Sequence, residues 1–293
     1  MFGTNEIVGQ KYFKDAPKDS LFVTSMFFTL QGEGPYAGMP ALFIRLTKCN
    51  LACSFCDTFF DDGDWMTYEV LETKMYHTIC DYWNSRGIPV PLWALSGDGG
   101  PIYPGVVLVI TGGEPSLQSN LTEFLERQIG DFHSVQIESN GTVNLPIHEE
   151  VTLVCSPKCA EKNGVAVKYL SPTRQILERA DCLKFVMSSE PGSPYSTIPD
   201  WAHKWKLENP SKEIYVSPMN VYNTFPQKIK ILHAEKGNIT MDQRSTVDEV
   251  ISFWEPGLLD LAANQANHEY TARYCMDYGL RLNLQMHLYA SLA

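Results

Sequence analysis

The chain has 293 residues, of which 44% are hydrophobic and 19% charged, and its formal net charge is −11. This composition predicts a packed core and disfavours a nucleic-acid partner, whose phosphates attract basic proteins. No apolar stretch reaches the length of a membrane span, and residues 1–20 lack the apolar core of a signal peptide. Eight cysteines in a chain of this length do not indicate a secreted disulfide scaffold, so we expect a cytoplasmic protein.

The first elements lead into a cysteine-rich loop. Residues 21–30 are rich in Phe, Val and Thr and predict a strand. The glycine-rich segment 31–35 then predicts a sharp turn. A hairpin tip is the ordinary interpretation, but Gln31 and Glu33 beside the next strand favour a binding loop. That strand, predicted over residues 41–46, delivers Arg45 and then the cysteines.

Three cysteines follow at the spacing C-x3-C-x2-C, namely Cys49, Cys53 and Cys56. Thiols this close in sequence predict one shared inorganic centre. An iron–sulfur cubane is normally held by four thiolates, so three would leave one iron open to a small ligand. A zinc knuckle or three buried thiols are the alternatives, although zinc sites usually show two close ligand pairs.

This spacing, with Phe55 before the last cysteine, resembles the signature of the radical S-adenosylmethionine superfamily. The resemblance implies that the open iron binds S-adenosylmethionine and that an electron from the cluster frees a 5′-deoxyadenosyl radical. Phe55 would then pack against the adenine.

The middle of the chain alternates helices and strands. Residues 67–84 predict a helix with Thr67 as its N-cap, and the proline-rich residues 86–105 predict an irregular insertion. Residues 106–110 predict a strand buried on both faces, followed by a helix over 116–129. Between them, the pair Gly112-Gly113 would let a ligand approach the backbone closely, next to Glu114.

The β/α alternation continues to the end. Further strands are predicted at 135–138, 151–155, 181–187 and 213–216, with helices from about 171 and over 258–276. A last strand at 280–284 alternates apolar and polar residues, which predicts a half-buried strand at a sheet edge. We therefore expect one α/β domain with a parallel sheet or barrel, whose active face lies at the carboxyl ends of the strands.

The remaining cysteines carry weaker signals. Cys155 and Cys159 form another C-x3-C pair, so an auxiliary cluster has to be considered, but no third or fourth cysteine follows nearby. Cys80, Cys182 and Cys275 are isolated and are expected to pack as small hydrophobic residues.

Seven motifs together resemble the 7-carboxy-7-deazaguanine synthase family. They are Gln-Gly-Glu-Gly at 31–34, Phe-Ile-Arg-Leu at 43–46, Cys-Asp-Thr at 56–58, Thr-Gly-Gly-Glu-Pro at 111–115, Glu-Ser-Asn-Gly-Thr at 138–142, Ser-Pro-Lys at 156–158 and Leu-Gln-x-His at 284–287. The resemblance implies an incomplete (βα) barrel of the TIM type in a single domain, 1–293, often dimeric. It also implies conversion of 6-carboxy-5,6,7,8-tetrahydropterin to 7-carboxy-7-deazaguanine by radical ring contraction with loss of ammonia, in a queuosine-type pathway.

The same resemblance implies roles for individual residues. Cys49, Cys53 and Cys56 would hold a [4Fe–4S] cluster. S-adenosylmethionine would meet Phe55, Asp57, Gly113, Glu114, Ser139, Ser156, Pro157, Lys158, Ser217, Pro218, Met219 and Asn220. The pterin would meet Leu30, Gln31, Gly32, Glu33, Arg45, Thr111, His287 and the terminal carboxylate of Ala293, with Glu33 and Arg45 counted as catalytic. Thr58 would help to hold Mg²⁺, and a flavodoxin or ferredoxin would reduce the cluster.

Some features depart from the family pattern. The segment 57–111 is longer than usual, with 86–105 as the expected insertion; residues 224–246 have no clear counterpart; and Leu288 follows His287 where a basic residue is common. Two alternatives also stay open: a radical enzyme for another substrate, such as a glycyl-radical activase, and a non-enzymatic metal-binding module. An activase would have no reason to carry Gln31, Glu33, Arg45, Thr58 and His287 together.

Overall fold

The computed structural model describes residues 6–56, 58–97, 100–221 and 261–286. The strands are β1 (Ser20–Leu30), β2 (Pro40–Leu46), β3 (Asp64–Thr67), β4 (Tyr103–Gly112), β5 (Phe132–Ser139), β6 (Val151–Cys155), β7 (Cys159–Lys162), β8 (Val165–Tyr169), β9 (Cys182–Met187), β10 (Glu213–Pro218) and β11 (Arg281–Leu282). The helices are α1 (Tyr68–Asn84), α2 (Leu121–Gln128), α3 (Arg174–Arg179), α4 (Asp200–Glu208) and α7 (Leu261–Tyr278). Short 3-10 helices lie at Gln10–Phe13, Gly34–Tyr36, Pro115–Leu117 and Pro194–Ser196.

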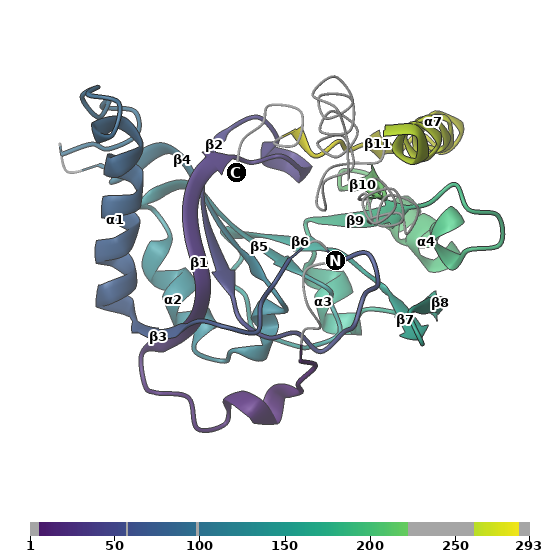
Figure 1. Cartoon of the computed structure of the whole chain (residues 1–293), viewed down its shortest axis with the longest axis horizontal. Helices are drawn as coiled ribbons and strands as arrows, with labels where there is room; N and C mark the ends of the chain where they lie inside the picture. Colours follow the sequence, from purple (N-terminus) through teal and green to yellow (C-terminus); the bar gives the residue numbers. More distant parts are fainter. Residues whose placement is uncertain (1–5, 57, 98–99, 222–260, 287–293) are drawn as a thin grey trace, which may run out of the picture.

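A nine-stranded sheet in the order β11-β10-β9-β6-β5-β4-β2-β1-β3 forms the centre of the molecule. Neighbouring strands from β11 to β2 are parallel, and β1 and β3 are added through antiparallel pairs. The sheet curves strongly, with α1 and α2 at one side and α4 and α7 at the other (Figure 1). The architecture is therefore a mostly parallel α/β sheet, open between its edge strands β11 and β3.

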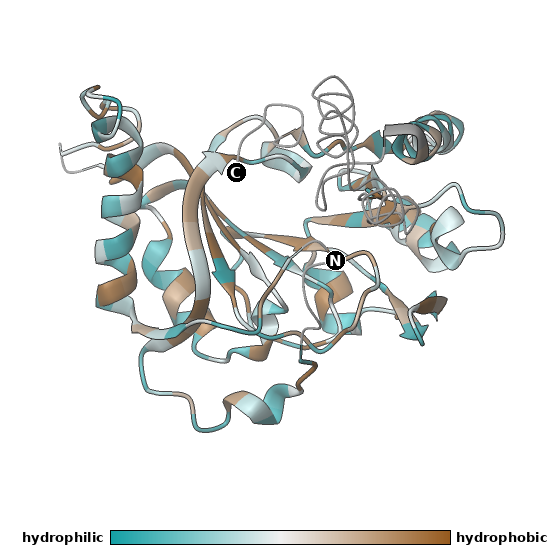
Figure 2. Ribbon diagram, in the orientation of Figure 1, coloured by the Kyte–Doolittle hydropathy of each residue, from teal (hydrophilic) through white to brown (hydrophobic). Residues whose placement is uncertain are grey.

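The core lies along the sheet and under the helices that cover it. Every side chain from Val106 to Ile110 is fully buried, which confirms that β4 is covered on both faces. Figure 2 shows the corresponding hydrophobic colouring along the central strands. In α1 the buried stripe includes Leu71, Met75 and Ile79, and the Thr67 side chain accepts a hydrogen bond from the Val70 N–H, so the predicted helix and cap are confirmed.

The helix expected over 116–129 is interrupted. A 3-10 turn occupies Pro115–Leu117, and α2 begins only at Leu121. The cause is Gln118, whose amide pairs with Phe22: its Oε1 accepts from the Phe22 N–H at 2.8 Å, and its Nε2 donates to the Phe22 carbonyl at 3.0 Å. Gln118 thus continues the hydrogen bonding of β1 instead of a helix.

The last strand is shorter than predicted, and its alternation is reversed. β11 spans only Arg281–Leu282, at the sheet edge as expected. Leu282 is 41% exposed, whereas Asn283 is 4% exposed. Asn283 is buried because its side chain accepts from the Gly34 N–H and donates to Ser217 and Glu33. Hydrogen bonding therefore overrides the apolar pattern here.

Two other segments also differ from expectation. A β7–β8 hairpin, missed in the sequence, follows the Ser-Pro-Lys motif. Within the expected insertion, the Gly105 N–H donates to the Trp93 carbonyl at 2.7 Å, and the Trp93 ring meets Trp83 of α1 edge-on. β4 begins at Tyr103 rather than at 106, because Tyr103 pairs with Phe132 of β5.

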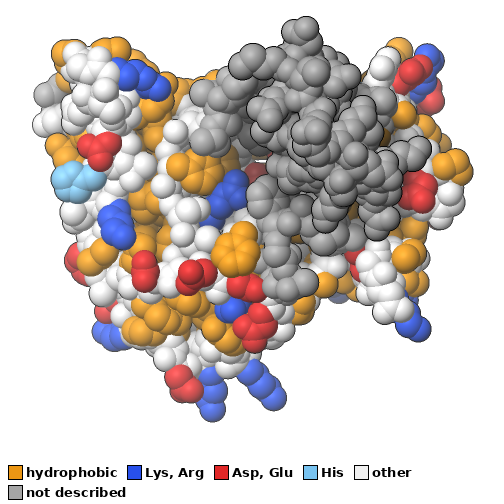
Figure 3. Space-filling model, viewed as in Figure 1, with side chains coloured by type: hydrophobic (Ala, Val, Ile, Leu, Met, Phe, Trp, Pro, Cys, Tyr) orange, Lys and Arg blue, Asp and Glu red, His pale blue; other side chains and the backbone are white. Residues whose placement is uncertain are grey.

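Acidic and basic side chains are interspersed over the described part of the face seen in Figure 3, and this part carries no large area of one sign. Among the described residues, no helix combines the length and apolarity that crossing a bilayer requires.

Candidate active site

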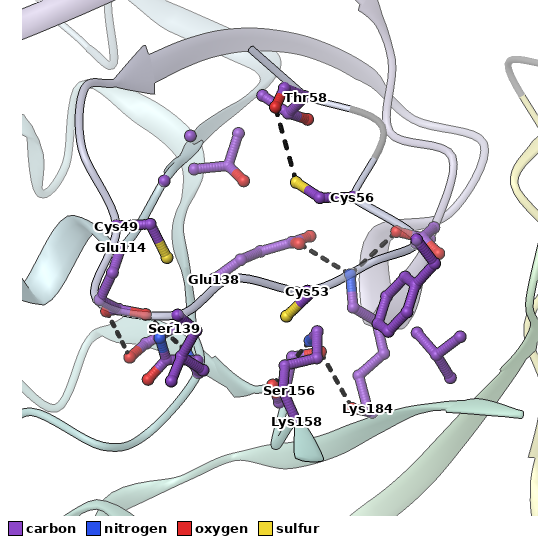
Figure 4. A pocket seen from close by; sticks show the side chains of 18 of the residues that line it. Cys49, Cys53, Cys56, Thr58, Glu114, Glu138, Ser139, Ser156, Lys158 and Lys184 are labelled. Atoms are coloured by element: carbon purple, nitrogen blue, oxygen red, sulfur yellow. Dashed lines mark hydrogen bonds and ion pairs between the residues drawn. The ribbon is translucent and has the colours of Figure 1, made fainter. Parts of the chain in front are cut away.

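A pocket of about 250 Å³ lies where the strand ends β2, β4, β5, β6 and β10 meet the loop that follows β1. Cys49, Cys53 and Cys56 all line it, and their sulfur atoms point into the same space (Figure 4). Carboxyl ends of parallel strands are the usual place for ligands in α/β folds. The structure therefore places the cysteine motif where a ligand site is expected.

The cysteine loop is anchored at its start. Lys48 adopts a left-handed backbone with φ of 67°, and its N–H donates to the Phe60 carbonyl at 2.7 Å. The Cys49 carbonyl accepts from the Val8 N–H at 2.8 Å, so the N-terminal segment holds the loop as well. The Lys48 ammonium is paired with Glu6 at 2.8 Å. These contacts turn the chain sharply from β2 into the pocket.

The chemistry of the three thiols fits a cluster better than a single ion. In the described part of the chain, no three His, Cys, Asp or Glu side chains lie close enough together to hold one metal ion. A zinc ion needs all of its thiolates within about 2.3 Å of one point, whereas a cubane spreads them over separate irons. Three thiols that line one pocket suit the cubane, in which each thiolate binds a separate iron.

Burial raises the pKa of the Cys49 thiol to about 12 and that of Cys53 to about 11. The charge of Glu114 adds to the shift at Cys49, while the ammonium of Lys158 opposes it at Cys53. A coordinated metal reverses this preference, because its positive charge deprotonates the bound thiol.

The glycine pair after β4 lets two segments of the protein backbone pack closely against each other. A Cβ on Gly113 would lie 1.9 Å from the Lys48 carbonyl oxygen, and one on Gly112 would lie 2.1 Å from that of Leu46. The Gly113 N–H donates to the Leu46 carbonyl and the Glu114 N–H to the Lys48 carbonyl. The close approach predicted for a ligand is therefore made by the cysteine loop, which packs directly on this turn.

Glu114 is 1% exposed at the floor of the pocket. Its carboxylate accepts hydrogen bonds from the Asn140 N–H at 2.7 Å, the Ser139 hydroxyl at 2.8 Å and the Ser116 N–H at 3.0 Å. Burial raises the pKa of Glu114, and these hydrogen bonds oppose that rise. The carboxylate is thus fixed in orientation before any ligand binds.

The loop 31–36 crosses the inner face of the sheet and reaches strands far from β1. The Tyr36 hydroxyl lies 2.9 Å from the Thr152 hydroxyl and accepts a hydrogen bond from Ser134. Glu33 pairs with Lys184 of β9 at 2.9 Å and accepts from the Ser217 hydroxyl of β10. The loop therefore connects the antiparallel strands β1 and β2, as the hairpin interpretation expects, and it also reaches β5, β6, β9 and β10.

Gln31 presents an unused donor. Its Oε1 accepts from the Glu33 N–H at 3.1 Å, but its Nε2 is buried and has no hydrogen-bond partner among the described residues. Gln31 is 2% exposed and lines the pocket. A buried polar atom without a partner is costly, so this amide is well suited to donate to a ligand.

Arg45 also lines the pocket. Its Nη1 donates to the Thr58 hydroxyl at 2.8 Å, and its guanidinium lies 5.1 Å from the ring centroid of Phe27. The ring and the hydroxyl hold the guanidinium in place, which leaves a planar cation facing the pocket.

Two further predicted residues, Lys158 and Phe55, line the pocket. The Lys158 ammonium donates to the Ser156 carbonyl and hydroxyl, and burial lowers its pKa. The Phe55 ring meets Tyr195 edge-on at 5.2 Å. Both residues line the pocket, so the Ser-Pro-Lys motif and the cysteine loop share one wall.

Most of the predicted site residues line this pocket. These are Gln31, Glu33, Arg45, Cys49, Cys53, Phe55, Cys56, Thr58, Thr111, Gly113, Glu114, Ser139, Ser156, Lys158, Ser217, Pro218 and Asn220. Leu30, Gly32, Pro157 and Met219 do not line it; for Met219 the backbone N–H is paired with the Met187 carbonyl in the sheet. Asp57, His287 and Ala293 lie outside the described residues, as do residues 224–246 and Leu288.

Some pocket residues were missed in the sequence, above all Lys184 and Glu138, together with Phe43, Val186 and Gln285. Lys184 had a signal: it interrupts the apolar strand Cys-Leu-Lys-Phe-Val-Met, where a buried charge requires a partner. Glu138 is the first residue of the Glu-Ser-Asn-Gly-Thr motif, and the family resemblance implies no role for it.

Comparison with known proteins agrees with the site. No family model matches the chain. It is 29% identical to 7-carboxy-7-deazaguanine synthase of Rickettsia prowazekii, over 94% of each chain. Identity to the same enzyme of Rhodospirillum rubrum is 30%, over 76% of this chain and 84% of the relative.

The fold has a solved counterpart. The crystal structure of QueE from Escherichia coli matches 96% of this chain and 99% of that chain, with a TM-score of 0.52 and 20% identity. At that identity the likeness shows a shared fold. The sequence relatives set aside the glycyl-radical activase and the non-enzymatic metal-binding module. The chain belongs to the 7-carboxy-7-deazaguanine synthase family of radical S-adenosylmethionine lyases.

Proposed function

We propose that this chain converts 6-carboxy-5,6,7,8-tetrahydropterin to 7-carboxy-7-deazaguanine by radical ring contraction with loss of ammonia, in queuosine-type biosynthesis. The observation that carries the proposal is one pocket that combines three cysteine thiols with the donors of Gln31 and Arg45 and the carboxylate of Glu33. The thiols supply a place for radical chemistry, and the other groups supply a polar frame for a small planar acid.

Cys49, Cys53 and Cys56 would hold a [4Fe–4S] cluster, and S-adenosylmethionine would bind beside it. When bound, this pair supplies a 5′-deoxyadenosyl radical for hydrogen abstraction. The chain positions the cofactor with Glu114, Ser156 and Lys158, whose hydrogen bonds fix them on the pocket wall before binding. Phe55, Gly113, Ser139, Ser217, Pro218 and Asn220 complete this side of the pocket.

The pterin would occupy the side formed by Gln31, Glu33, Arg45 and Thr111. A guanidinium pairs with a carboxylate through two parallel hydrogen bonds, so Arg45 would bind the substrate carboxylate. The Glu33 carboxylate accepts hydrogen bonds from N–H groups, and the free Gln31 Nε2 donates one to a ring carbonyl or nitrogen. This arrangement orients the ring relative to the cysteine loop.

Magnesium is a further proposal. Mg²⁺ prefers oxygen ligands, and the Thr58 hydroxyl lies on the pocket wall. That hydroxyl already accepts a hydrogen bond from Arg45, so two cations would meet at one oxygen. The substrate carboxylate between them would offset their repulsion, and we therefore expect Mg²⁺ to bind together with the substrate.

The roles assigned to His287 and to the carboxylate of Ala293 rest on the family resemblance. The tail after β11 starts next to the pocket, since Gln285 lines it. Appending a few glycines after Ala293 would move the terminal charge without altering the core. Pterin affinity should fall while S-adenosylmethionine cleavage without substrate persists. Unchanged kinetics would remove the terminus from the site.

We further propose that residues 1–293 form a single domain whose curved sheet is an incomplete TIM-type barrel, and that the chain acts as a homodimer. One large cluster of buried residues extends from Leu21 to Cys275, which supports a single domain. All eight cysteines are free thiols, which suits the reducing cytoplasm and a flavodoxin or ferredoxin as electron donor.

The function is tested by anaerobic reconstitution with iron and sulfide. The protein is reduced, incubated with S-adenosylmethionine, Mg²⁺ and carboxytetrahydropterin, and the products are analysed by mass spectrometry. Formation of the deazapurine with 5′-deoxyadenosine supports the proposal. Cleavage of S-adenosylmethionine without any deazapurine would leave a radical enzyme and contradict the proposed substrate.

A further inference from the structure

Lys184 lies in the pocket between two carboxylates that come from different parts of the chain. Its ammonium is 2.9 Å from Glu33 Oε2, in the loop after β1, and 2.7 Å from Glu138 Oε2, in β5 (Figure 4). The exposed fraction of the side chain is 7% for Lys184, 15% for Glu33 and 16% for Glu138. The buried ammonium of Lys184 thus forms ion pairs with two carboxylates that are themselves largely buried.

Other hydrogen bonds hold each carboxylate in one orientation. Glu33 Oε1 accepts from the Ser217 hydroxyl at 3.1 Å and from the Asn283 amide at 3.2 Å. Glu138 Oε1 accepts from the Gln136 amide at 3.1 Å. In both carboxylates, therefore, one oxygen is held by neutral donors and the other faces Lys184. The ammonium decides whether the two anions remain close together.

The charge environment of Lys184 favours its ammonium form. Burial alone lowers the pKa of Lys184, but Glu138 and Glu33 outweigh it and raise the pKa above its ordinary value. Among the described residues, titratable groups near it also include the Lys158 ammonium, from the loop after β6, the Cys182 thiol, from its own strand, and Tyr215, its register partner in β10. Without Lys184, two carboxylates would share a space from which water is largely excluded, and one of them would take up a proton.

We propose that Lys184 is a positioning residue for substrate binding, which keeps Glu33 ionised and aimed at the N–H groups of the bound ring. This inference rests on the proposed function, because it requires a ligand whose donors face Glu33. Lys184 does not itself need to touch the substrate. Its contribution is to hold a second carboxylate, Glu138, next to Glu33 without loss of either charge.

The test substitutes Lys184→Met, which keeps the length of the side chain and removes the charge. Without ligand, the variant should be less stable than wild type by about 10 °C in Tm at pH 8, because a broken buried ion pair leaves uncompensated charge. In the variant the two carboxylates face each other without a cation between them. Acid weakens this repulsion between like charges, so the deficit should shrink towards pH 5.

Substrate binding by Lys184→Met should become weaker at low pH, where its stability recovers. The KM for the pterin should rise about tenfold or more at pH 7 and worsen as pH falls, since protonation removes the acceptor. Iron content and S-adenosylmethionine cleavage without pterin should stay at wild-type levels. Lys184→Arg, which keeps a cation, should restore the pH profile.

Two further variants make the result decisive. In the double variant Lys184→Met with Glu138→Gln, one of the two charges is gone, so stability should lose most of its new pH dependence. Lys212→Met is the matched control, because Lys212 is a part-buried lysine that donates to the Ala180 carbonyl outside the pocket. It should leave the pterin KM unchanged.

The outcomes separate the two proposals. If wild type makes no deazapurine, the proposed function fails, whereas the pH dependence of Tm still tests the charge network. If wild type is active and Lys184→Met has a normal KM and the wild-type pH profile of stability, the role of Lys184 is wrong. A uniform loss of Tm at every pH, with normal KM, would show a merely structural lysine and would also overturn it.

Discussion

The carboxylate of Glu114 accepts a hydrogen bond of 2.7 Å from the Asn140 N–H, and it thereby ties the end of β4 to the end of β5. Glu114→Gln would turn an amide NH2 towards donors that now face a carboxylate oxygen. We expect S-adenosylmethionine affinity to fall about tenfold and the free energy of unfolding to fall by about 1–3 kcal/mol, because a buried donor loses its acceptor. Calorimetric titration and urea unfolding measure the two effects.

Glu126→Gln on the exposed side of α2 is the control for that change, and it should alter neither quantity. If Glu114→Gln binds S-adenosylmethionine like wild type, Glu114 is a structural tie between strands and has no part in holding the cofactor.

The turn after β4 packs directly against the cysteine loop, so we expect a larger residue in this turn to displace the loop. In Gly113→Ala the new Cβ would lie 1.9 Å from the Lys48 carbonyl oxygen, so either the turn or the loop has to move. We expect a loss of about 2 kcal/mol or more in stability together with reduced iron content after reconstitution. Gly97→Ala is the control, because no atom of the described residues lies within 4 Å of a Cβ there. Equal iron content in both variants would contradict the close packing.

The cluster should depend on three of the eight cysteines. Ala substitution of Cys49, Cys53 or Cys56 should each remove iron and abolish S-adenosylmethionine cleavage, because a cubane held by two thiolates is not stable. Cys159→Ala should keep both, since Cys159 is 2% exposed and does not line the pocket. Iron analysis and absorption spectra after anaerobic reconstitution measure this. Bleaching in Cys159→Ala would indicate a second centre.

Arg45 should be required as a planar cation. Its guanidinium is held between the Thr58 hydroxyl and the Phe27 ring, a geometry that an ammonium does not reproduce. Arg45→Ala should raise the pterin KM about a hundredfold, and Arg45→Lys should recover little of it. S-adenosylmethionine cleavage without pterin is the internal control and should persist. Wild-type pterin binding in both variants would remove Arg45 from the site.

We expect the contribution of Tyr68 to the free energy of unfolding to change at alkaline pH. Its hydroxyl donates to the Asn120 carbonyl at 2.6 Å, and burial raises the pKa of Tyr68 from 10.0 to about 12. A raised pKa stabilises the fold below the unfolded value, and this contribution is lost as pH rises from about 10 to about 12. Tyr68→Phe should therefore cost about 1 kcal/mol at pH 8 and less at pH 11, as measured by urea unfolding. A constant difference would show that Tyr68 ionises normally.

The sequence alone determined the local features of this protein. The spacing of Cys49, Cys53 and Cys56, the buried run before Thr111 and the cap at Thr67 all depend on residues close together in the chain. Periodicity and turn chemistry report such features directly. The motifs around them were sufficient to indicate the family and most of the residues that line the pocket.

Tertiary structure decided the features that depend on residues far apart in the chain. Gln118 interrupts a predicted helix near its start, where its side chain pairs with the backbone of Phe22, and Asn283 is buried because its side chain donates hydrogen bonds to Glu33 and Ser217. The pairing of Lys184 with Glu33 joins positions 151 residues apart. No local pattern encodes such contacts, because their free energy arises only when the folded sheet brings the buried groups together and removes the water between them.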